Sequence, residues 1–78
     1  MITVEYYGVL KGIVGARSET FGVRSTVAEL LADVALRHPD IAGALPGTAV
    51  ARDEELVPRS AELRDGVTVA LLPPVSGG

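Results

Sequence analysis

Apolar and polar residues alternate in several segments of the chain, and this period of two predicts half-buried β-strands. The longest such segments are residues 2–7, the more polar 17–23, and 67–72. The last is apolar at nearly every position, so we expect it to lie in the middle of a sheet with much of both faces covered. Residues 48–51 and 56–58 predict a small hairpin, whose second strand lies at an edge because proline cannot donate to a sheet.

A helical period replaces this alternation after Thr26. The sequence Thr26-Val-Ala-Glu29 fits a capping box, in which each of these two side chains bonds the backbone N–H of the other residue. The following apolar residues have helical spacing and form one face: Val27, Leu30, Leu31, Val34 and Ala35. We expect the helix to begin at Val27 and to end at His38, because Pro39 disfavours helical geometry in the residue before it.

Two connecting stretches complete the expected core. Residues 8–15 contain three glycines and predict a loop or short helical turn, with its apolar side chains placed under the core: Val9, Leu10, Ile13 and Val14. The glycine spacing matches neither common phosphate-binding motif, so we interpret them as turn glycines. Residues 39–47 predict a linker with a short turn that adds Ile41 and Leu45 to the edge of the core.

The order of these elements is strand, strand, helix, short strands, strand. In a chain of 78 residues this predicts a single α+β domain, with one main helix packed across a sheet of four to five strands. The sequence order alone does not specify which strands are neighbours.

Composition narrows the classes of partner. The formal net charge is −3 and aromatic residues make up only 4%, so the chain has neither the basic surface nor the stacking rings of a nucleic-acid or anionic-membrane binder. No apolar run is long enough for a bilayer span, and we expect a cytoplasmic protein with protein partners.

Few residues offer catalytic or metal-binding chemistry. The absence of cysteine excludes a disulfide, a thiolate ligand and a cysteine nucleophile. The single histidine, His38, has no second imidazole with which to share a metal, and we expect it to face solvent or cap the helix. The acidic residues 53–55 predict a solvated hairpin tip. We therefore expect no metal and no tightly bound cofactor.

The chain end is the most distinctive segment. Residues 73–78 read Pro-Pro-Val-Ser-Gly-Gly and directly follow the last predicted strand. The two prolines stop sheet pairing and favour an extended arm, which at polyproline rise reaches on the order of 20 Å. Gly77 and Gly78 carry no side chain, so the tip suits a narrow channel and its carboxylate is open to attack.

This ending, Leu-Leu-Pro-Pro-Val-Ser-Gly-Gly, resembles that of molybdopterin synthase small subunits, which are ubiquitin-like sulfur carriers. Weaker similarity covers most of the chain, including the opening Ile-Thr-Val-Glu-Tyr-Tyr and the segment Leu-Arg-Asp-Gly-Val-Thr-Val. The resemblance implies a β-grasp fold for residues 1–72, with the first and last strands side by side, and an extended tail in residues 73–78.

The resemblance also implies a function. The carboxylate of Gly78 would be adenylated by an ATP-using activating enzyme and converted to a thiocarboxylate with sulfur from a donor protein. The tail would then enter the synthase large subunit and give its sulfur to a cyclic pterin precursor. The tail residues expected in that channel are Pro73, Pro74, Val75, Ser76 and Gly77, and the expected interface on the body is Leu72 with Tyr7. The chain would be no enzyme on its own.

Two alternatives remain open. Ala51, Val67 and Leu72 stand where relatives often have other residues, so the chain is also compatible with a sulfur carrier for thiamine synthesis or another pathway. The same tail would serve a ubiquitin-like modifier or binding module that is joined to lysines of other proteins.

Overall fold

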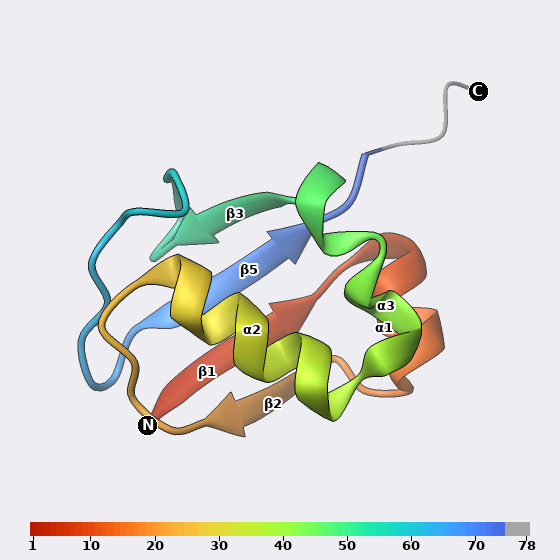
Figure 1. Ribbon diagram of the computed structural model, residues 1–78, viewed down its shortest axis with the longest axis horizontal. Coiled ribbons are helices and arrows are strands. Elements are labelled where there is room, and N and C mark those ends of the chain that lie inside the picture. Colours follow the sequence, from red (N-terminus) through yellow and green to blue (C-terminus); the bar gives the residue numbers. More distant parts are fainter. Residues whose placement is uncertain (75–78) are drawn as a thin grey trace.

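The computed structural model describes residues 1–74 and contains one five-stranded sheet with the order β2-β1-β5-β3-β4. The strands are β1 Ile2–Tyr6, β2 Ser18–Phe21, β3 Ala49–Arg52, β4 Glu55–Leu56 and β5 Thr68–Leu72. The helices are α1 Gly8–Val14, α2 Val27–Arg37, α3 Pro39–Ala42 and the 3-10 turn η1 Leu45–Gly47. Helix α2 lies diagonally across one face of the sheet (Figure 1).

The two middle strands come from opposite ends of the sequence. Strand β1 pairs with β5 in parallel, with Tyr6 opposite Leu71, while β1–β2 and β3–β5 are antiparallel. A mixed sheet with this order and one main helix across it is the expected ubiquitin-like β-grasp. Strand β2, Ser18–Phe21, is shorter than the predicted strand of residues 17–23, and Val23 beyond its end is half exposed.

Alternate residues of the strands form the core under α2. Val4, Val69 and Leu71 are fully buried, and α2 covers them with Val27, Leu30 and Val34, all at 0% exposure. The expected edge residues Ile41 and Leu45 are buried as well. The helical and strand periods therefore predicted which side chains meet in the core.

The stretch of residues 8–15 differs from its prediction. It is a seven-residue helix, α1, that directs only Leu10 fully into the core and Val14 partly. Val9 and Ile13 are 62% and 48% exposed, so the expectation that they lie under the core is wrong. A helix this short presents one narrow face to the sheet, and these two residues lie outside it.

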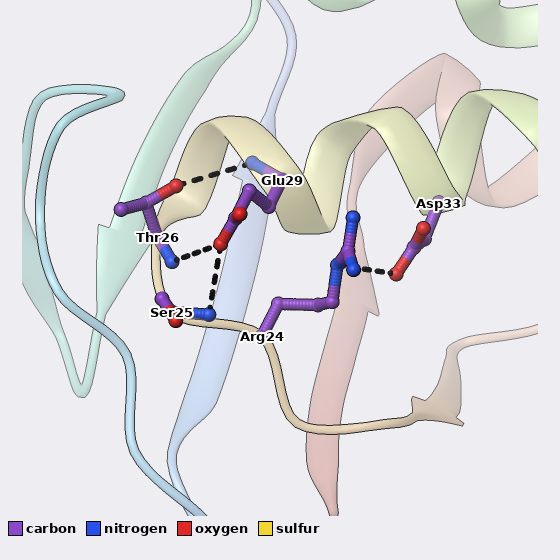
Figure 2. A network of polar contacts seen from close by, with 5 residues as sticks. All are labelled: Arg24, Ser25, Thr26, Glu29 and Asp33. Carbon is purple, nitrogen blue, oxygen red and sulfur yellow. Dashed lines mark hydrogen bonds and ion pairs between the residues drawn. The ribbon is translucent and has the colours of Figure 1, made fainter.

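The N-terminus of α2 has the predicted capping box. Glu29 N–H donates to the Thr26 hydroxyl at 3.3 Å, and Glu29 Oε1 accepts from the N–H groups of Thr26 and Ser25 at 3.2 and 3.0 Å (Figure 2). The Arg24 side chain forms an ion pair with Asp33 one turn further along (Figure 2). These contacts satisfy free N–H groups of the first turn and fix where α2 begins.

The other end of α2 is held against β1 and β2. Glu19 Oε1 lies 2.5 Å from His38 Nε2 and accepts from the Tyr6 hydroxyl at 2.8 Å. The guanidinium of Arg37 lies over the ring of Phe21. His38 is the C-cap of α2, with its backbone N–H donating to the Val34 carbonyl, so the expected capping role is confirmed. Its side chain contacts Glu19 instead of facing solvent, the other expected role.

The face of the sheet away from α2 is less covered than the face that packs against α2. Thr68, Ala70 and Leu72 alternate with the buried Val69 and Leu71 and are only partly buried. The central position of β5 is confirmed, and its expected cover is complete toward α2 and partial on the other face.

Candidate functional site

The base of the tail is fixed by the middle of the sheet. Strand β5 ends at Leu72, and the ring of Pro73 packs beside Gly8, where β1 turns into α1. Gly8 has a φ of +55°, and a Cβ there would lie 3.2 Å from Pro73 Cγ. A side chain at position 8 would crowd the proline ring and would have to adopt a positive φ, so glycine suits this junction of α1 and the tail base.

The reactive end predicted from the sequence lies beyond this point. Pro74 is exposed at the end of the described chain. Val75, Ser76, Gly77 and Gly78, the remaining predicted tail residues, lie outside the described residues.

A groove of about 680 Å³ lies on the uncovered face of the sheet, next to the base of the tail. Alternation along three strands brings its walls together, because paired residues of neighbouring strands point to the same face. Its lining residues are Glu5, Tyr7, Ala51, Asp53, Glu54, Thr68, Ala70 and Leu72. The floor is apolar or small, and three carboxylates stand around it.

Tyr7 and Leu72, the two predicted interface residues, both line this groove. Tyr7 is 46% exposed, and its hydroxyl donates to Glu5 Oε1 at 3.3 Å. The negative charge of Glu5 and this hydrogen bond raise the pKa of Tyr7, and Glu54 adds to the effect. Tyr7 therefore stays a neutral hydrogen-bond donor on an acidic, partly apolar surface.

The β3–β4 turn supplies the other carboxylates. Asp53 and Glu54 have φ angles of 48° and 73°, in the left-handed region that residues other than glycine rarely adopt. Asp53 holds the turn against β5, since its Oδ1 accepts from the Thr68 N–H at 3.0 Å and its own N–H donates to the Thr68 carbonyl at 2.9 Å. The hairpin tip is solvent-exposed as predicted, and Asp53 is also tied to the central strand.

The groove has the features of a docking surface. Within residues 1–74, no three His, Cys, Asp or Glu side chains are grouped closely enough to hold a metal ion. The glycines of residues 8–15 belong to a helix and its ends, so they form no phosphate-binding loop. A concave face of apolar floor and charged rim suits contact with another protein.

Sequence reasoning missed the acidic part of this site. Glu5, Asp53 and Glu54 come from two distant segments, and only the β1–β5–β3 pairing brings them to one face. The available signal was the period of β1, which puts Glu5 on the same side as Tyr7, away from the core.

No helix in the described part of the chain is long and apolar enough to cross a membrane.

Comparison with known proteins gives a consistent result. The profile described as the ThiS family matches residues 4–78, nearly the whole chain. The chain is 33% identical to the molybdopterin synthase sulfur carrier subunit of Chlamydomonas reinhardtii, over 99% of this chain and 98% of that protein.

Two solved structures add the fold and the context in which it occurs. A chain of the Amycolatopsis orientalis BexX/CysO complex is 30% identical with a TM-score of 0.85, and each chain is covered completely. A chain in the complex of subunits 1 and 2 of the molybdopterin-converting factor of Helicobacter pylori is 24% identical with a TM-score of 0.72, over 99% of this chain and 97% of that one. Both neighbours are seen bound to a partner protein.

Proposed function

The chain belongs to the ThiS family of sulfur carriers, and on this premise we propose that it is the sulfur-carrier subunit of a molybdopterin synthase. Proteins of this family carry sulfur without catalysing a reaction themselves. The full-length similarity to the Chlamydomonas subunit favours the molybdenum cofactor pathway over the other pathways that use such carriers.

The proposed chemistry begins at the carboxylate of Gly78. A carboxylate resists nucleophiles, since its charge repels them and oxide is a poor leaving group. In the active site of an adenylating enzyme, a carboxylate oxygen attacks the α-phosphorus of ATP and pyrophosphate leaves. The acyl-adenylate that results has AMP as a good leaving group.

Sulfur then enters at the same carbon. A sulfide equivalent from a donor protein attacks the acyl carbon, the bond to AMP breaks, and a thiocarboxylate remains. This group is ionised at neutral pH and is a nucleophile in its turn. Within the synthase its sulfur bonds to a carbon of the cyclic pterin precursor, water then cleaves the acyl–sulfur bond, and the chain returns to its carboxylate form.

The observation that carries the proposal is the position of the tail base. The tail starts from β5, the central strand, beside a groove that lies on the uncovered face of the sheet. A partner that binds this face therefore lies next to the start of the six-residue tail, Pro73 to Gly78. ATP and the pterin bind to the partners, while this chain provides the acyl group.

Three partners follow from this proposal: the synthase large subunit, the adenylating enzyme and the sulfur-donor protein. The Helicobacter complex pairs a chain of this fold with a second subunit of the molybdopterin-converting factor, which supports the first of them. We assign Leu72 and Tyr7 to the surface that contacts the large subunit, because both line the groove beside the tail.

Reconstitution tests the proposal. The thiocarboxylated chain is mixed with the large subunit of the same organism and the cyclic pterin precursor, and the dithiolene product is measured. We expect product formation in proportion to the thiocarboxylate supplied. The matched control is the same chain with an unmodified carboxylate, which should give none.

The opposite result would redirect the assignment. If the thiocarboxylated chain bound a thiazole-synthase-like protein and left the pterin precursor unchanged, it would serve thiamine synthesis. Isopeptide adducts on other proteins, formed without any thiocarboxylate, would identify a protein modifier.

The interface assignment has its own test. Tyr7→Ala should weaken the complex with the large subunit while leaving the unfolding midpoint nearly unchanged, because Tyr7 is half exposed. Isothermal titration calorimetry measures the affinity. An unaltered dissociation constant would remove Tyr7 from the interface.

A further inference from the structure

The charged side chains that line the groove are all acidic. Three of the molecule's ten acidic side chains, Glu5, Asp53 and Glu54, line the groove, and no basic side chain does. The seven acidic side chains elsewhere are balanced in number by the seven lysine and arginine side chains. The formal charge of −3 is therefore equal to the charge of this one surface.

Glu54 occupies a position where glutamate is unfavourable. A two-residue hairpin turn with both central residues at positive φ favours glycine at the second place. Glu54 stands there with a φ of 73°. Within the described residues, no hydrogen bond or ion pair links its carboxylate to another group, so no such contact offsets the strain of this φ angle. In this part of the chain, the carboxylate of Glu54 therefore makes no contact that stabilises the turn.

The apolar floor lies within the same surface. Ala51, Ala70 and Leu72 form it, and Leu72 leads directly into Pro73 and the tail. A protein that receives the tail must approach along this floor and meets the carboxylates at its edge. Charged rims around an apolar contact set the choice of partner and the rate of association.

We propose that the acidic rim of the groove selects an adenylating enzyme whose docking surface carries lysine or arginine side chains facing Glu54, Asp53 and Glu5. This rests on the proposed role as a sulfur carrier, and it names the chemistry of the partner at the same surface. The adenylating enzyme would dock on this face first and the large subunit afterwards, because the chain end must be activated before it can deliver sulfur.

The basic side chains nearest the groove lie next to it on the β1 side and would orient a basic partner. Lys11 and Arg17 line a neighbouring hollow that also includes Glu5 and Tyr7. Two basic side chains therefore lie next to the groove on the β1 side, whereas the β3–β4 turn is acidic. A basic partner surface is attracted to this face only where it lies over the β3–β4 turn. This fixes the orientation of the partner, and hence the direction from which the tail enters its active site.

Steady-state kinetics of the adenylating enzyme of the same organism provide the test. ATP–pyrophosphate exchange is followed at varied concentrations of the full chain. Glu54→Gln should raise KM for the chain about three- to tenfold and Glu54→Lys more than about tenfold, with kcat unchanged, because docking and not chemistry is altered. The Debye length falls from about 10 Å at 0.1 M salt to about 3 Å at 1 M, so the difference between the variants should shrink at high salt.

Glu54→Gly separates the proposal from a purely structural role. Glycine relieves the strained φ and should raise the melting temperature, yet it removes the charge and should raise KM as Glu54→Gln does. A structural role predicts that stability and docking change together. The matched control is Glu55→Gln. Glu55 lies opposite Arg52 in the β3–β4 ladder, on the face of the hairpin away from the groove. The KM for the Glu55→Gln chain should therefore change by less than about twofold.

Equal KM values for the wild-type chain, Glu54→Gln and Glu54→Lys at low salt would overturn the inference. The result is independent of the pathway, since activation precedes delivery of the sulfur. A carrier that fails to convert the pterin precursor, but whose activation depends on Glu54, would contradict the molybdopterin assignment and leave the acidic docking surface established.

Discussion

The two faces of the sheet come from the same strands and differ in almost every respect. Toward α2, Val4, Val69 and Leu71 are fully buried. On the other face, their chain neighbours Glu5 and Leu72 line an open groove with a charged rim. One residue along a strand therefore separates a side chain that holds the fold from one that is free to contact a partner.

This comparison shows how a chain of 78 residues accommodates both a core and a docking surface. Burying both faces would stabilise the domain further but would leave no surface beside the tail. The α2 face carries the stability, and the uncovered face is left for recognition. Substitutions on the two faces should consequently give different and separable phenotypes.

The largest expected effect is on the covered face. Leu71→Ala empties a fully buried position and should lower the free energy of unfolding by about 2–5 kcal/mol, measured by urea denaturation. The affinity per folded molecule for the partner should stay the same, because Leu71 does not line the groove. A large loss of affinity at conditions where the variant is fully folded would contradict the separation of the faces.

The neighbouring residue should behave in the opposite way. Leu72→Ala removes apolar area from the groove floor and should weaken binding of the large subunit about tenfold, or about 1.4 kcal/mol. Its free energy of unfolding should change by less than about 1 kcal/mol, since the side chain is only partly buried. Calorimetric titration and urea denaturation on the same preparation measure both, with Leu71→Ala as the matched variant.

A smaller effect is expected at the start of α2. Thr26→Ala removes the acceptor for the Glu29 N–H and should cost about 1 kcal/mol in the free energy of unfolding. Partner affinity and activation should not change, because the capping box lies on the covered side. Serine at the same position keeps a hydroxyl acceptor and should restore most of the stability.

The smallest effect is a pH dependence at the other end of α2. Burial raises the pKa of Glu19, but the hydrogen bonds from His38 and Tyr6 and the charges of His38 and Arg37 outweigh it, so the pKa of Glu19 lies below its ordinary value. A carboxyl group whose pKa is lower in the folded state stabilises the fold at pH values above its unfolded pKa. This stabilisation is lost as the pH falls through its folded-state pKa.

Urea denaturation between pH 7 and pH values below the ordinary 4.5 of a glutamate tests this. Stability of the wild-type chain should fall on acidification, and Glu19→Gln should show a flatter profile because it has no carboxylate to titrate. Identical slopes for the two chains would mean that the contacts of Glu19 do not contribute to the pH dependence.

Local signals in the sequence predicted the elements well. The Thr26 and Glu29 pair and the spacing of Leu30, Leu31 and Val34 placed α2 because a cap and an amphipathic face depend on residues a few positions apart. The glycines of residues 8–15 suggested only a loop or a short helical turn, and this left the positions of Val9 and Ile13 undetermined by any helical period. In a helix this short, packing against the sheet decides the exposed face.

Contacts between distant segments were beyond the sequence. The parallel pairing of β1 with β5 was expected only from family resemblance, since residues more than sixty positions apart leave no local pattern. The contact of His38 with Glu19 and the meeting of Glu5 with the Asp53–Glu54 turn depend on that topology too. The tail motif was visible because its residues are contiguous, whereas the docking surface is assembled from three strands.

The central claim is that this domain carries sulfur at its terminal acyl group, and intact-mass spectrometry tests it most directly. The chain is incubated with its adenylating enzyme, ATP and a sulfur donor, alongside a variant that lacks Gly77 and Gly78. The account predicts a mass increase of one oxygen-to-sulfur exchange in the full chain and none in the shortened variant. No exchange in the full chain, or the same exchange in both, would contradict it.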